Sequence, residues 1–452
     1  MKISKCIKEA MLNGVKIIKE HISGEDIYSA LPEAEKFEIE FCIEVEKSGY
    51  YNIYLNYKIE KYARAVYLVD IDGLCYGDVR LNSESDEVSK EKIGRVFLES
   101  GQKKIKIYAG WGIAQVYAIE LEEAKLQDYS VPSFDLSNKN ASDKCKKLME
   151  YFSEIYGKAI VAGQHTNTAV GPEISYIEYQ TGKKPALRGF DFLSYTRHTI
   201  TDNMTYDAMF EVMLNRGSVE EAIKWHKELG GIVTFCWHWF SPTGGSDKTF
   251  YTKNTDFDVE AALCPNTKEN KLLIEDIYEI GKWLKIMADA DVPVIFRPLH
   301  EADGRWFWWG AKGFAAYKKL YYLLYDVYTN YFKLNNLIWV WNAPHPDWRI
   351  EKDYYDIAGV DFYAPPQNYG PISFWYDYVY ELTEAKKPIA LTENGPIPDP
   401  DVLQNTKTYW LWFMPWWGGF ATDGKINSFE HLRKVYNHPY VITLDRFDLF
   451  RG

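Results

Sequence analysis

The stretch VPVIFRPLHEADGRWFWWG, residues 292–310, joins an apolar segment to a loop that begins with polar residues and ends with aromatic ones. The nearly continuous apolar run at its start predicts a buried strand. Arg297, His300 and Glu301 follow where this strand ends. Polar side chains at the end of a buried strand are typical of parallel sheets, in which the carboxyl ends of the strands carry the chemistry.

The same pattern of an apolar run followed by polar or aromatic residues recurs along the chain. Eight strands are expected after residue 142, at residues 159–164, 186–190, 232–237, 292–299, 337–341, 357–362, 389–392 and 409–413. Helical segments separate several of them, such as residues 218–229, where Ser218 and Glu221 suggest a capping box and Gly230 a stop. This alternation favours an α/β fold, the closed (β/α)8 TIM barrel. An open doubly wound sheet is the alternative, but the glycine-rich phosphate turn typical of it is absent from the sequence.

The first 125 residues show a different pattern. Residues 51–57 alternate between two faces, and further strands are expected at 65–71, 95–98 and 104–108, with turns such as Asp72-Gly73 between them. This period of two predicts an all-β sandwich over residues 1–125. The apolar pattern then lapses, so we expect a linker over residues 126–141 and the barrel over residues 142–452.

Composition excludes several classes of function. The net charge of −12 comes without any run of Lys or Arg, which argues against nucleic acid as a partner. No apolar stretch is long enough to span a bilayer, so no membrane partner is expected. The N-terminal sequence MKISKCIKEAMLNG lacks the apolar core of a secretory signal, which predicts a cytoplasmic protein, or an extracellular one if a signal peptide has been removed. We expect a monomer.

The cysteines give no sign of a metal site. Cys6, Cys42, Cys75, Cys145, Cys236 and Cys264 form no CxxC pair and lie in no His-rich spacing typical of zinc. We therefore expect buried free thiols, no metal and no cofactor.

Two acidic residues suit the hydrolysis of a glycosidic bond, which needs one carboxylic acid and one carboxylate on opposite sides of the sugar. Glu301 fits the acid, because its aromatic neighbours would desolvate the charged form and raise the pKa. Glu393 ends the apolar run of KPIALTENG, residues 387–395, and fits a nucleophile that Arg297 would keep ionised. The structural alternatives are a Glu301 that only pairs with Arg297 and a Glu393 that only begins a helix.

The segments RPLHEADGRWFWWG and LTENG resemble the two catalytic signatures of glycoside hydrolase family 26. GGIVTFCWHW, IWVWNAP and GVDFYAP fall in the expected order, so the resemblance covers residues 142–452. It implies a (β/α)8 barrel and a retaining mechanism, with Glu301 as acid/base at the end of strand four and Glu393 as nucleophile at the end of strand seven. It also implies substrate contacts at His238, His300, Trp306, Asp361, Tyr363 and Trp416. The cluster of aromatic residues after Glu301 adds Trp308, although core packing is an alternative for each aromatic residue.

The resemblance also predicts the substrate. Members of this family mostly cleave β-1,4-mannan, others cleave β-1,3-1,4-glucan or β-1,3-xylan, and WFWWG looks more like the mannanases. We expect an endo-acting enzyme that cleaves mannan, galactomannan or glucomannan by double displacement, with residues 240–270 forming a wall of the groove. The alternatives are a polysaccharide-binding protein without catalysis and a metal-dependent hydrolase that uses His238, His300 and Glu301.

Two segments of the N-terminal region, GYYNIYLNY and IKIYAGWGIAQVYAIELE, resemble carbohydrate-binding modules of family 35 or 6. The resemblance implies Trp111 as the binding platform, with Tyr50, Tyr76 and Tyr108 as candidate neighbours for which core packing is an equal alternative. Such modules often hold calcium near the N-terminus. The acidic residues here do not clearly reproduce that site, so calcium is left open.

Overall fold

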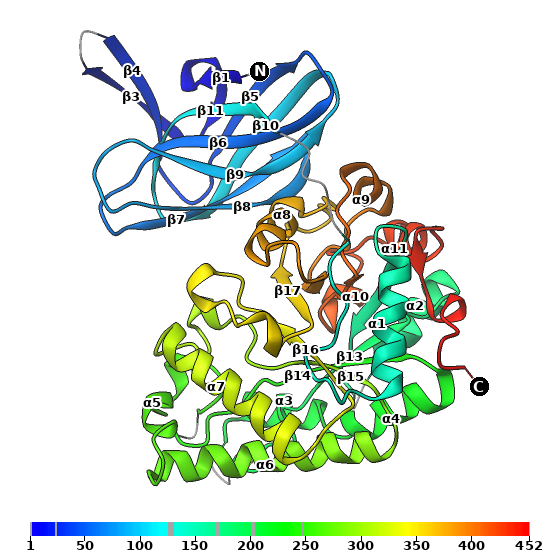
Figure 1. Ribbon diagram of the computed structural model, residues 1–452. Coiled ribbons are helices and arrows are strands. Elements are labelled where there is room, and N and C mark those ends of the chain that lie inside the picture. Colours follow the sequence, from blue (N-terminus) through cyan, green and yellow to red (C-terminus); the bar gives the residue numbers. More distant parts are fainter. Residues whose placement is uncertain are drawn as a thin grey trace. The chain divides into compact units, whose positions relative to one another are not determined.

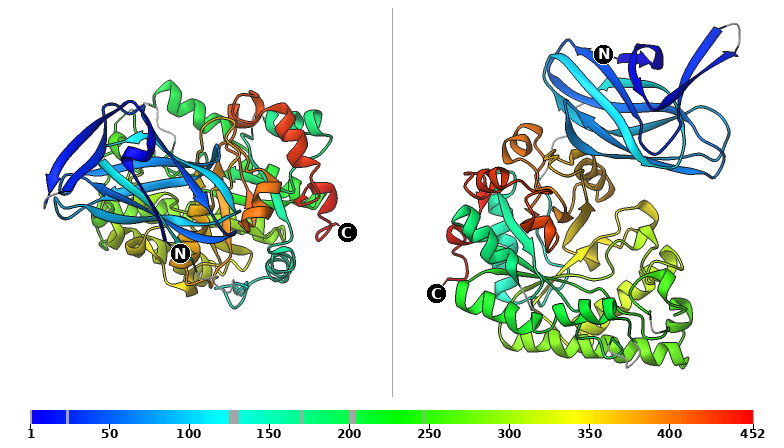
Figure 2. Two further views of the ribbon diagram at one scale, coloured as in Figure 1. Left: turned by 90° about the horizontal axis from the view of Figure 1, so that it is seen from above. Right: turned by 180° about the vertical axis from the view of Figure 1, so that it is seen from behind.

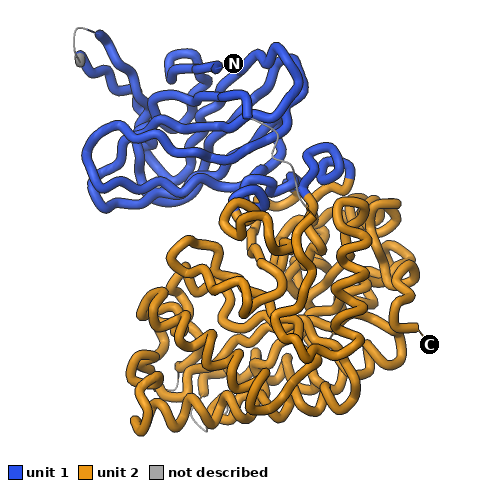
Figure 3. The backbone as a smooth tube through the Cα atoms, viewed as in Figure 1, with its two compact units in different colours: residues 1–129, 368–378, 401–408 blue, residues 130–367, 379–400, 409–452 orange. Residues whose placement is uncertain are grey.

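The computed structural model describes residues 2–22, 25–124, 131–168, 171–199, 204–245 and 247–451. The chain forms two compact units (Figure 1 and Figure 3). Unit 1 holds Met1–Tyr129, Asn368–Tyr378 and Asp401–Thr408, and unit 2 holds Ser130–Gln367, Val379–Pro400 and Tyr409–Gly452. The expected boundary at residues 125–126 lies outside the described residues. The two later segments of unit 1 were not predicted.

Unit 1 is a sandwich of two antiparallel sheets, which confirms the predicted all-β fold. The first sheet has the order β3 (Val15–Ile22), β4 (Glu25–Pro32), β11 (Gln115–Glu123), β6 (Gly49–Lys58) and β9 (Ser89–Leu98), with β1 (Lys2–Cys6) beside β11. The second has the order β2 (Ala10–Asn13), β5 (Glu38–Val45), β10 (Gly101–Trp111), β7 (Arg64–Ile71) and β8 (Leu74–Asn82). Alternate residues over much of β5, β6 and β10 are buried between the sheets, as the period-two pattern requires.

A residue from a distant part of the sequence completes the core of this sandwich. Phe374, in the part of α8 (Ser373–Leu382) that belongs to unit 1, is 2% exposed and lies 5.6 Å from the ring of Tyr76. Gly94 on β9 makes room for it, because a Cβ atom there would overlap the Phe374 ring. The indole N–H of Trp375 donates to Asp78 at 2.7 Å. Unit 1 therefore needs residues 368–378 for a complete core.

Unit 2 contains a barrel of parallel strands with helices around it (Figure 2). The strands are β12 (Ile160–His165), β13 (Leu187–Asp191), β14 (Ile232–Cys236), β15 (Val294–Arg297), β16 (Leu337–Trp341), β17 (Ile357–Phe362), β18 (Ile389–Asn394) and β19 (Trp412–Phe413). The backbone N–H of Asn394 donates to Met414 at 3.0 Å, and that of Trp416 donates to Asn394 at 3.0 Å, which closes the ring between β18 and β19. All the predicted strands are present, and the TIM barrel is confirmed. β20 (Val441–Ile442), which pairs with β12, was not predicted.

The remaining helices are α1 (Asp143–Ile155), α2 (Pro172–Thr181), α3 (Tyr206–Leu214), α4 (Ser218–Leu229), α5 (Val259–Ala262), α6 (Lys268–Asp289), α7 (Phe314–Asp326), α9 (Pro400–Thr406), α10 (Gly419–Thr422) and α11 (Phe429–Tyr436). Short turns of other helix types lie at η1 (Ile7–Glu9), η2 (Thr252–Asn254), η3 (Ala302–Gly304), η4 (Val327–Tyr331), η5 (Pro346–Trp348), η6 (Lys352–Tyr354) and η7 (Leu444–Arg446). Among the helices that the structure describes, none is both long and apolar enough to cross a membrane.

Three sequence predictions about these elements need correction. The N-cap of α4 is Gly217, and Ser218 is its first residue, whose hydroxyl donates to the carbonyl of Asp191 at 2.8 Å, so the predicted capping box is wrong. Leu136 is buried in the barrel core, so the second half of the expected linker packs as part of unit 2. Cys6 and Cys264 are exposed, and so not all of the thiols are buried.

Candidate active site

Two strands of the barrel bring the predicted catalytic carboxylates together. Glu301 follows β15, and Glu393 is the next-to-last residue of β18. One carboxylate oxygen from each of Glu301, Asp361 and Glu393 lies within 4.8 Å of the other two. Carboxyl groups about 5–5.5 Å apart are typical of retaining glycosidases, whereas inverting ones hold them roughly 6.5–9.5 Å apart. The spacing therefore fits the retaining class.

The backbone around Glu301 is strained. Leu299 and Glu301 adopt left-handed φ values of 53° and 54°, which cost on the order of 1–3 kcal/mol each for residues other than glycine. The N–H of Glu301 donates to the carbonyl of Asn342 at 2.8 Å, and the indole of Trp309 donates to the carbonyl of His300 at 2.9 Å. These bonds hold the turn in the conformation that places Glu301 in the cleft.

The surroundings of Glu301 favour its protonated form. Burial raises its pKa well above the ordinary value, and the negative charges of Asp361 and Glu393 raise it further. The indole N–H of Trp306 donates to Glu301 Oε2 at 2.9 Å, which orients the carboxyl group. A carboxyl group that keeps its proton near neutral pH can act as a general acid.

Glu393 is held by two donors instead. The guanidinium of Arg297 contacts Oε1, and the hydroxyl of Tyr363 donates to Oε2 at 2.8 Å. Burial disfavours the cation of Arg297, but the charges of Asp361 and Glu393 raise the pKa of this group well above its ordinary value. Arg297 therefore stays charged and stabilises Glu393 as an anion, which is the form that a nucleophile needs.

Asp361 is the second partner of Arg297, whose Nη1 lies 2.7 Å from Asp361 Oδ2. The other oxygen of Asp361 accepts hydrogen bonds from Thr392 at 2.6 Å and Asn342 at 3.1 Å. Burial raises the pKa of Asp361 to about 7, against the lowering effect of Arg297. Asp361 thus orients the guanidinium that holds the nucleophile.

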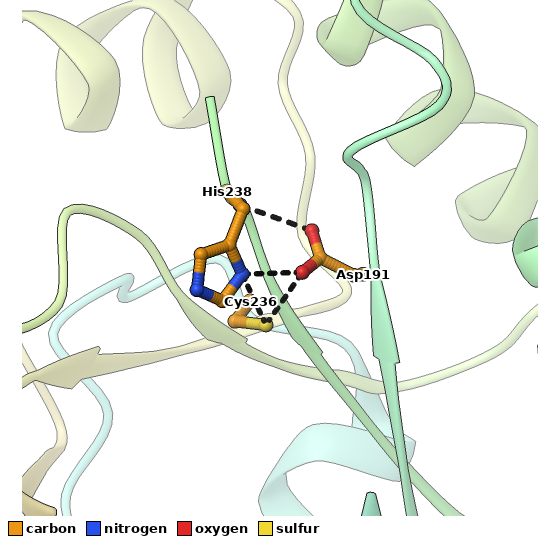
Figure 4. Close-up of side chains that lie close together, drawn as sticks. All are labelled: Asp191, Cys236 and His238. Carbon is orange, nitrogen blue, oxygen red and sulfur yellow. Dashed lines mark hydrogen bonds and ion pairs between the residues drawn. The ribbon is translucent and has the colours of Figure 1, made fainter. Parts of the chain in front are cut away.

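A second buried cluster joins the ends of β13 and β14 (Figure 4) and extends to His300 after β15. His238 Nδ1 lies 2.5 Å from Asp191 Oδ2, and Cys236 Sγ lies 3.4 Å from the same oxygen. His238 Nε2 lies 3.1 Å from His300 Nε2. Ligand atoms of a tetrahedral zinc ion are roughly 3.3 Å apart when their bonds are about 2.0–2.1 Å long. The direct contact between His238 and Asp191 is therefore too close for an ion to lie between them.

Glu301 and Glu393 line one cleft of about 210 Å³. Its other walls are formed by Asp191, Leu193, Glu211, Asn215, His238, Phe250, Tyr251, Phe307, Tyr363, Trp416 and Trp417. Phe250 and Tyr251 belong to the segment 240–270, which was expected to form a wall. Aromatic faces next to hydrogen-bonding groups suit a pyranose ring, which has apolar faces and a polar rim.

The predicted substrate-binding residues fall into three groups. His238, Tyr363 and Trp416 line the cleft, and Trp306 is 46% exposed beside Glu301. The side chains of Arg297, His300 and Asp361 are buried. Arg297 and His300 contact the lining residues Glu393 and His238, and Asp361 binds Arg297 behind them. Trp308 differs, because it is 1% exposed, its indole donates to the carbonyl of Trp239 at 2.6 Å, and its ring packs against Phe257. The structure places Trp308 in the core, and Trp308 is not among the residues that line the cleft.

Sequence reasoning missed several residues of the cleft. Glu211 and Asn215 lie on α3 and at its end, and they line the cleft only because of how α3 packs. No local pattern distinguishes them. Asp191 carried a signal, because it ends an apolar strand, but its contact with His238 joins residues far apart in the sequence.

In unit 1, Trp111 lies at the end of β10 and is 54% exposed, as a binding platform requires. Tyr50 and Tyr76 are buried, and the hydroxyl of Tyr108 donates to Asp70 at 2.8 Å. Of these aromatic residues, Trp111 is exposed and Tyr108 is half-buried.

Similarity to known proteins agrees with this geometry. Glycosyl hydrolase family 26 matches residues 137–446, and carbohydrate-binding module family 35 matches residues 13–124. A mannan endo-1,4-beta-mannosidase of Thermothelomyces thermophilus is 38% identical over 97% of this chain and 89% of its own. Mannan endo-1,4-beta-mannosidase B of Piromyces sp is 30% identical over 97% of this chain and 76% of its own.

Solved structures agree as well. The crystal structure of a Podospora anserina GH26-CBM35 beta-(1,4)-mannanase is 33% identical, with a TM-score of 0.68 over 100% of this chain and 99% of that one. A ruminal GH26 endo-beta-1,4-mannanase is 30% identical, with a TM-score of 0.67 over 90% of each chain. From the match over residues 137–446 and the paired carboxylates at the ends of β15 and β18, this chain belongs to glycoside hydrolase family 26 and is a glycoside hydrolase with an N-terminal carbohydrate-binding module of family 35.

Proposed function

We propose that this protein is a retaining endo-β-1,4-mannanase, with Glu301 as acid/base and Glu393 as nucleophile. The observation that carries the proposal is the pairing of Glu301, whose surroundings raise its pKa, with Glu393, which Arg297 and Tyr363 hold within 4.8 Å of it. The relatives named above support β-1,4-mannan, galactomannan or glucomannan as the substrate. Trp111 is the proposed platform for polysaccharide on unit 1.

The reaction proceeds by double displacement. A carboxylate oxygen of Glu393 attacks the anomeric carbon while the glycosidic C–O bond breaks, and Glu301 gives its proton to the departing oxygen. A water molecule then gives a proton to Glu301 and attacks the same carbon, which releases Glu393 as a carboxylate. Two inversions at one carbon retain its configuration.

The charges of the site match these two steps. In the free enzyme, the negative charge of Glu393 helps to raise the pKa of Glu301 and keeps the acid protonated. That charge disappears when Glu393 forms the covalent ester, so the pKa of Glu301 falls. Glu301 can then act as the base that the second step needs.

The two roles can be separated by the leaving group of the substrate. Glu301→Ala should lower activity on mannan by about 10²- to 10⁴-fold. It should form the covalent intermediate readily from a dinitrophenyl β-mannobioside, because this leaving group needs no proton. Glu393→Ala should be inactive on both substrates, and the exposed Glu150 of α1 offers a matched control, Glu150→Ala, with unchanged activity. Full activity of Glu301→Ala on mannan would refute the assignment.

The substrate is tested with a panel of mannan, galactomannan, glucomannan, β-1,3-1,4-glucan and β-1,3-xylan. New reducing ends from the first three support the proposal, and faster release from mixed-linkage glucan or β-1,3-xylan would replace mannan as the substrate. NMR of the first product should show the β-anomer, as retention requires. Binding to mannan without new reducing ends would indicate a polysaccharide-binding protein instead.

A further inference from the structure

Asp191 is a buried carboxylate that the mechanism above does not use. It ends β13, and its Oδ1 accepts the backbone N–H groups of Leu193 at 2.9 Å and His238 at 3.0 Å. Its Oδ2 faces the ring nitrogen Nδ1 of His238 at 2.5 Å, and the thiol of Cys236 donates to the same oxygen at 3.4 Å (Figure 4). Burial opposes the charge of Asp191, but His238 lowers the pKa of this carboxyl group below its ordinary value. An ionised carboxylate only accepts hydrogen bonds, so the proton between the two side chains lies on Nδ1 of His238.

The contacts continue from His238 to the acid/base. His238 Nε2 lies 3.1 Å from Nε2 of His300, which is buried and directly precedes Glu301. The backbone of Leu299 and Glu301, on either side of His300, is in the left-handed conformation. The contact with His238 holds the ring of His300 and thereby fixes the strained turn that carries Glu301.

Charged and titratable groups from several elements face His238 and shift its pKa and that of His300. The groups that face it come from five strands and one helix: His165 of β12, Asp191 of β13, Cys236 of β14, Arg297 of β15, His300 after β15, Glu393 of β18 and Glu211 of α3. Burial lowers the pKa of His238, but Asp191 outweighs this effect and raises it. Burial and the charge of Arg297 lower the pKa of His300 well below its ordinary value. A single proton between the two Nε2 atoms therefore joins the rings of His238 and His300.

We propose that Asp191 is a positioning residue for the glycosidase reaction, which keeps the proton on Nδ1 of His238 and, through His238 and His300, holds the turn that carries Glu301. The role of Glu301 in this inference rests on the proposed function. Asp191 also accepts hydrogen bonds from the thiol of Cys236 and from the backbone N–H groups of Leu193 and His238. These donors occupy the lone pairs of the carboxylate that the ring of His238 leaves free.

The variant Asp191→Asn tests the inference with little change in volume. Two backbone N–H groups already require one carbonyl oxygen at this position, so the NH2 group of Asn would face Nδ1 of His238. His238 must then release the proton from Nδ1 and accept a hydrogen bond there. The ring loses its charge-assisted bond, and its contact with His300 weakens.

A matched control is Asp356→Asn. Asp356 is also a buried carboxylate that accepts backbone N–H groups, from Ser137 at 2.5 Å and Trp339 at 2.7 Å. It precedes β17 and so lies at the opposite end of the barrel strands from Glu301. Equal effects of the two variants would indicate a general loss of stability and would overturn the inference.

The kinetic readout is the dependence on the leaving group. Asp191→Asn should lower kcat on mannan by about 10- to 100-fold, the range seen when a metal-bound histidine loses the partner of its other ring nitrogen, with little change in KM. Formation of the intermediate from dinitrophenyl β-mannobioside should fall much less, because a misplaced acid matters little for that substrate. Equal losses on both substrates would overturn the inference.

A second readout does not depend on activity. Nitrogen NMR of the nine histidine side chains, with the His238 signal identified by its loss in His238→Gln, reports which ring nitrogen carries a proton. Nδ1 of His238 should be protonated in the wild type and unprotonated in Asp191→Asn. An unprotonated Nδ1 in the wild type would overturn the inference even if Asp191→Asn does not fold. A wild type that is inactive on mannan would refute the proposed function, while the NMR result would still decide whether Asp191 controls His238.

Discussion

Two carboxylates contact one guanidinium at this site, a third carboxyl group lies beside them, and the charge of each depends on the others. Arg297 binds both Asp361 and Glu393, and Glu301 lies close to the same two carboxylates. Because Arg297 contacts the two residues that raise the pKa of Glu301, it limits their effect without removing it. One cation thus lets an anionic nucleophile and a protonated acid coexist in one cleft.

Asp361→Asn should move the alkaline limb of the pH profile to lower pH. The enzyme needs Glu301 protonated, so kcat/KM falls as the pH rises through the pKa of Glu301. Asp361, whose own pKa is about 7, is charged above that pH and raises the pKa of Glu301. Removing this charge lowers the pKa of Glu301, which kcat/KM measured from pH 4 to 10 on a mannan oligosaccharide would detect. The exposed Asp347 provides the control, Asp347→Asn, and an alkaline limb that stays in place or moves upward would contradict this account.

The raised pKa of Glu301 also makes the free energy of unfolding fall as the pH rises. The folded protein binds the proton of Glu301 more tightly than the unfolded chain, in which the pKa is near 4.5. The free energy of unfolding contributed by this group is therefore fully present below pH 4.5 and is lost as the pH rises toward the folded-state pKa. A catalytic requirement thus opposes stability at a single residue.

At the scale of the element, the loop after β15 carries two tryptophans with different tasks. The indole of Trp306 is exposed and donates to the carboxyl group of Glu301, whereas that of Trp308 is buried and donates to the carbonyl of Trp239. The residues are two positions apart, and the loop directs one toward the cleft and the other toward the core.

Phenylalanine at each position separates these tasks. Trp306→Phe removes a hydrogen bond to the acid, so it should lower kcat/KM on the order of tenfold without a change in the melting temperature. Trp308→Phe leaves a buried carbonyl without its donor and should lower the free energy of unfolding by about 1–3 kcal/mol, with kcat/KM nearly unchanged. Denaturant unfolding and kinetics on a mannan oligosaccharide measure both. If the Trp308→Phe enzyme has normal stability but binds substrate poorly, Trp308 is a sugar-binding residue and the core role is wrong.

The same loop shows what could be predicted from the sequence. The strands were predictable because continuous apolar runs report burial directly, and Glu301 and Glu393 were predictable because they end such runs in recognisable motifs. The core position of Trp308 was not, because composition does not say which way an irregular loop turns. The place of Ser218 was missed for a similar reason, since its hydroxyl binds a carbonyl of β13 and not its own helix. Contacts such as Asp191 with His238 depend on the barrel bringing neighbouring strand ends together.

At the scale of the whole molecule, sequence order and structural unit do not coincide. Unit 1 takes residues 368–378 from a stretch that lies between two barrel strands, β17 and β18. Phe374 fills the sandwich core beside Gly94 and Tyr76, and a buried ion pair joins Arg95 to Asp377 within the same unit. The N-terminal sequence alone therefore does not contain all of the core of its own domain.

Phe374→Ala should destabilise unit 1 selectively. Truncation of a buried phenylalanine typically lowers the free energy of unfolding by about 3–5 kcal/mol, and here the lost ring packs against β9 of the sandwich. Hydrogen exchange of the full chain, read by mass spectrometry, should show faster exchange in Ser89–Leu98 and Gly49–Lys58, with Leu337–Trp341 of the barrel unchanged. Phe314 of α7 is 43% exposed, so Phe314→Ala serves as the control and should leave exchange in both units as it was. If Phe374→Ala leaves exchange in Ser89–Leu98 unaltered, residues 368–378 do not contribute to the stability of the sandwich.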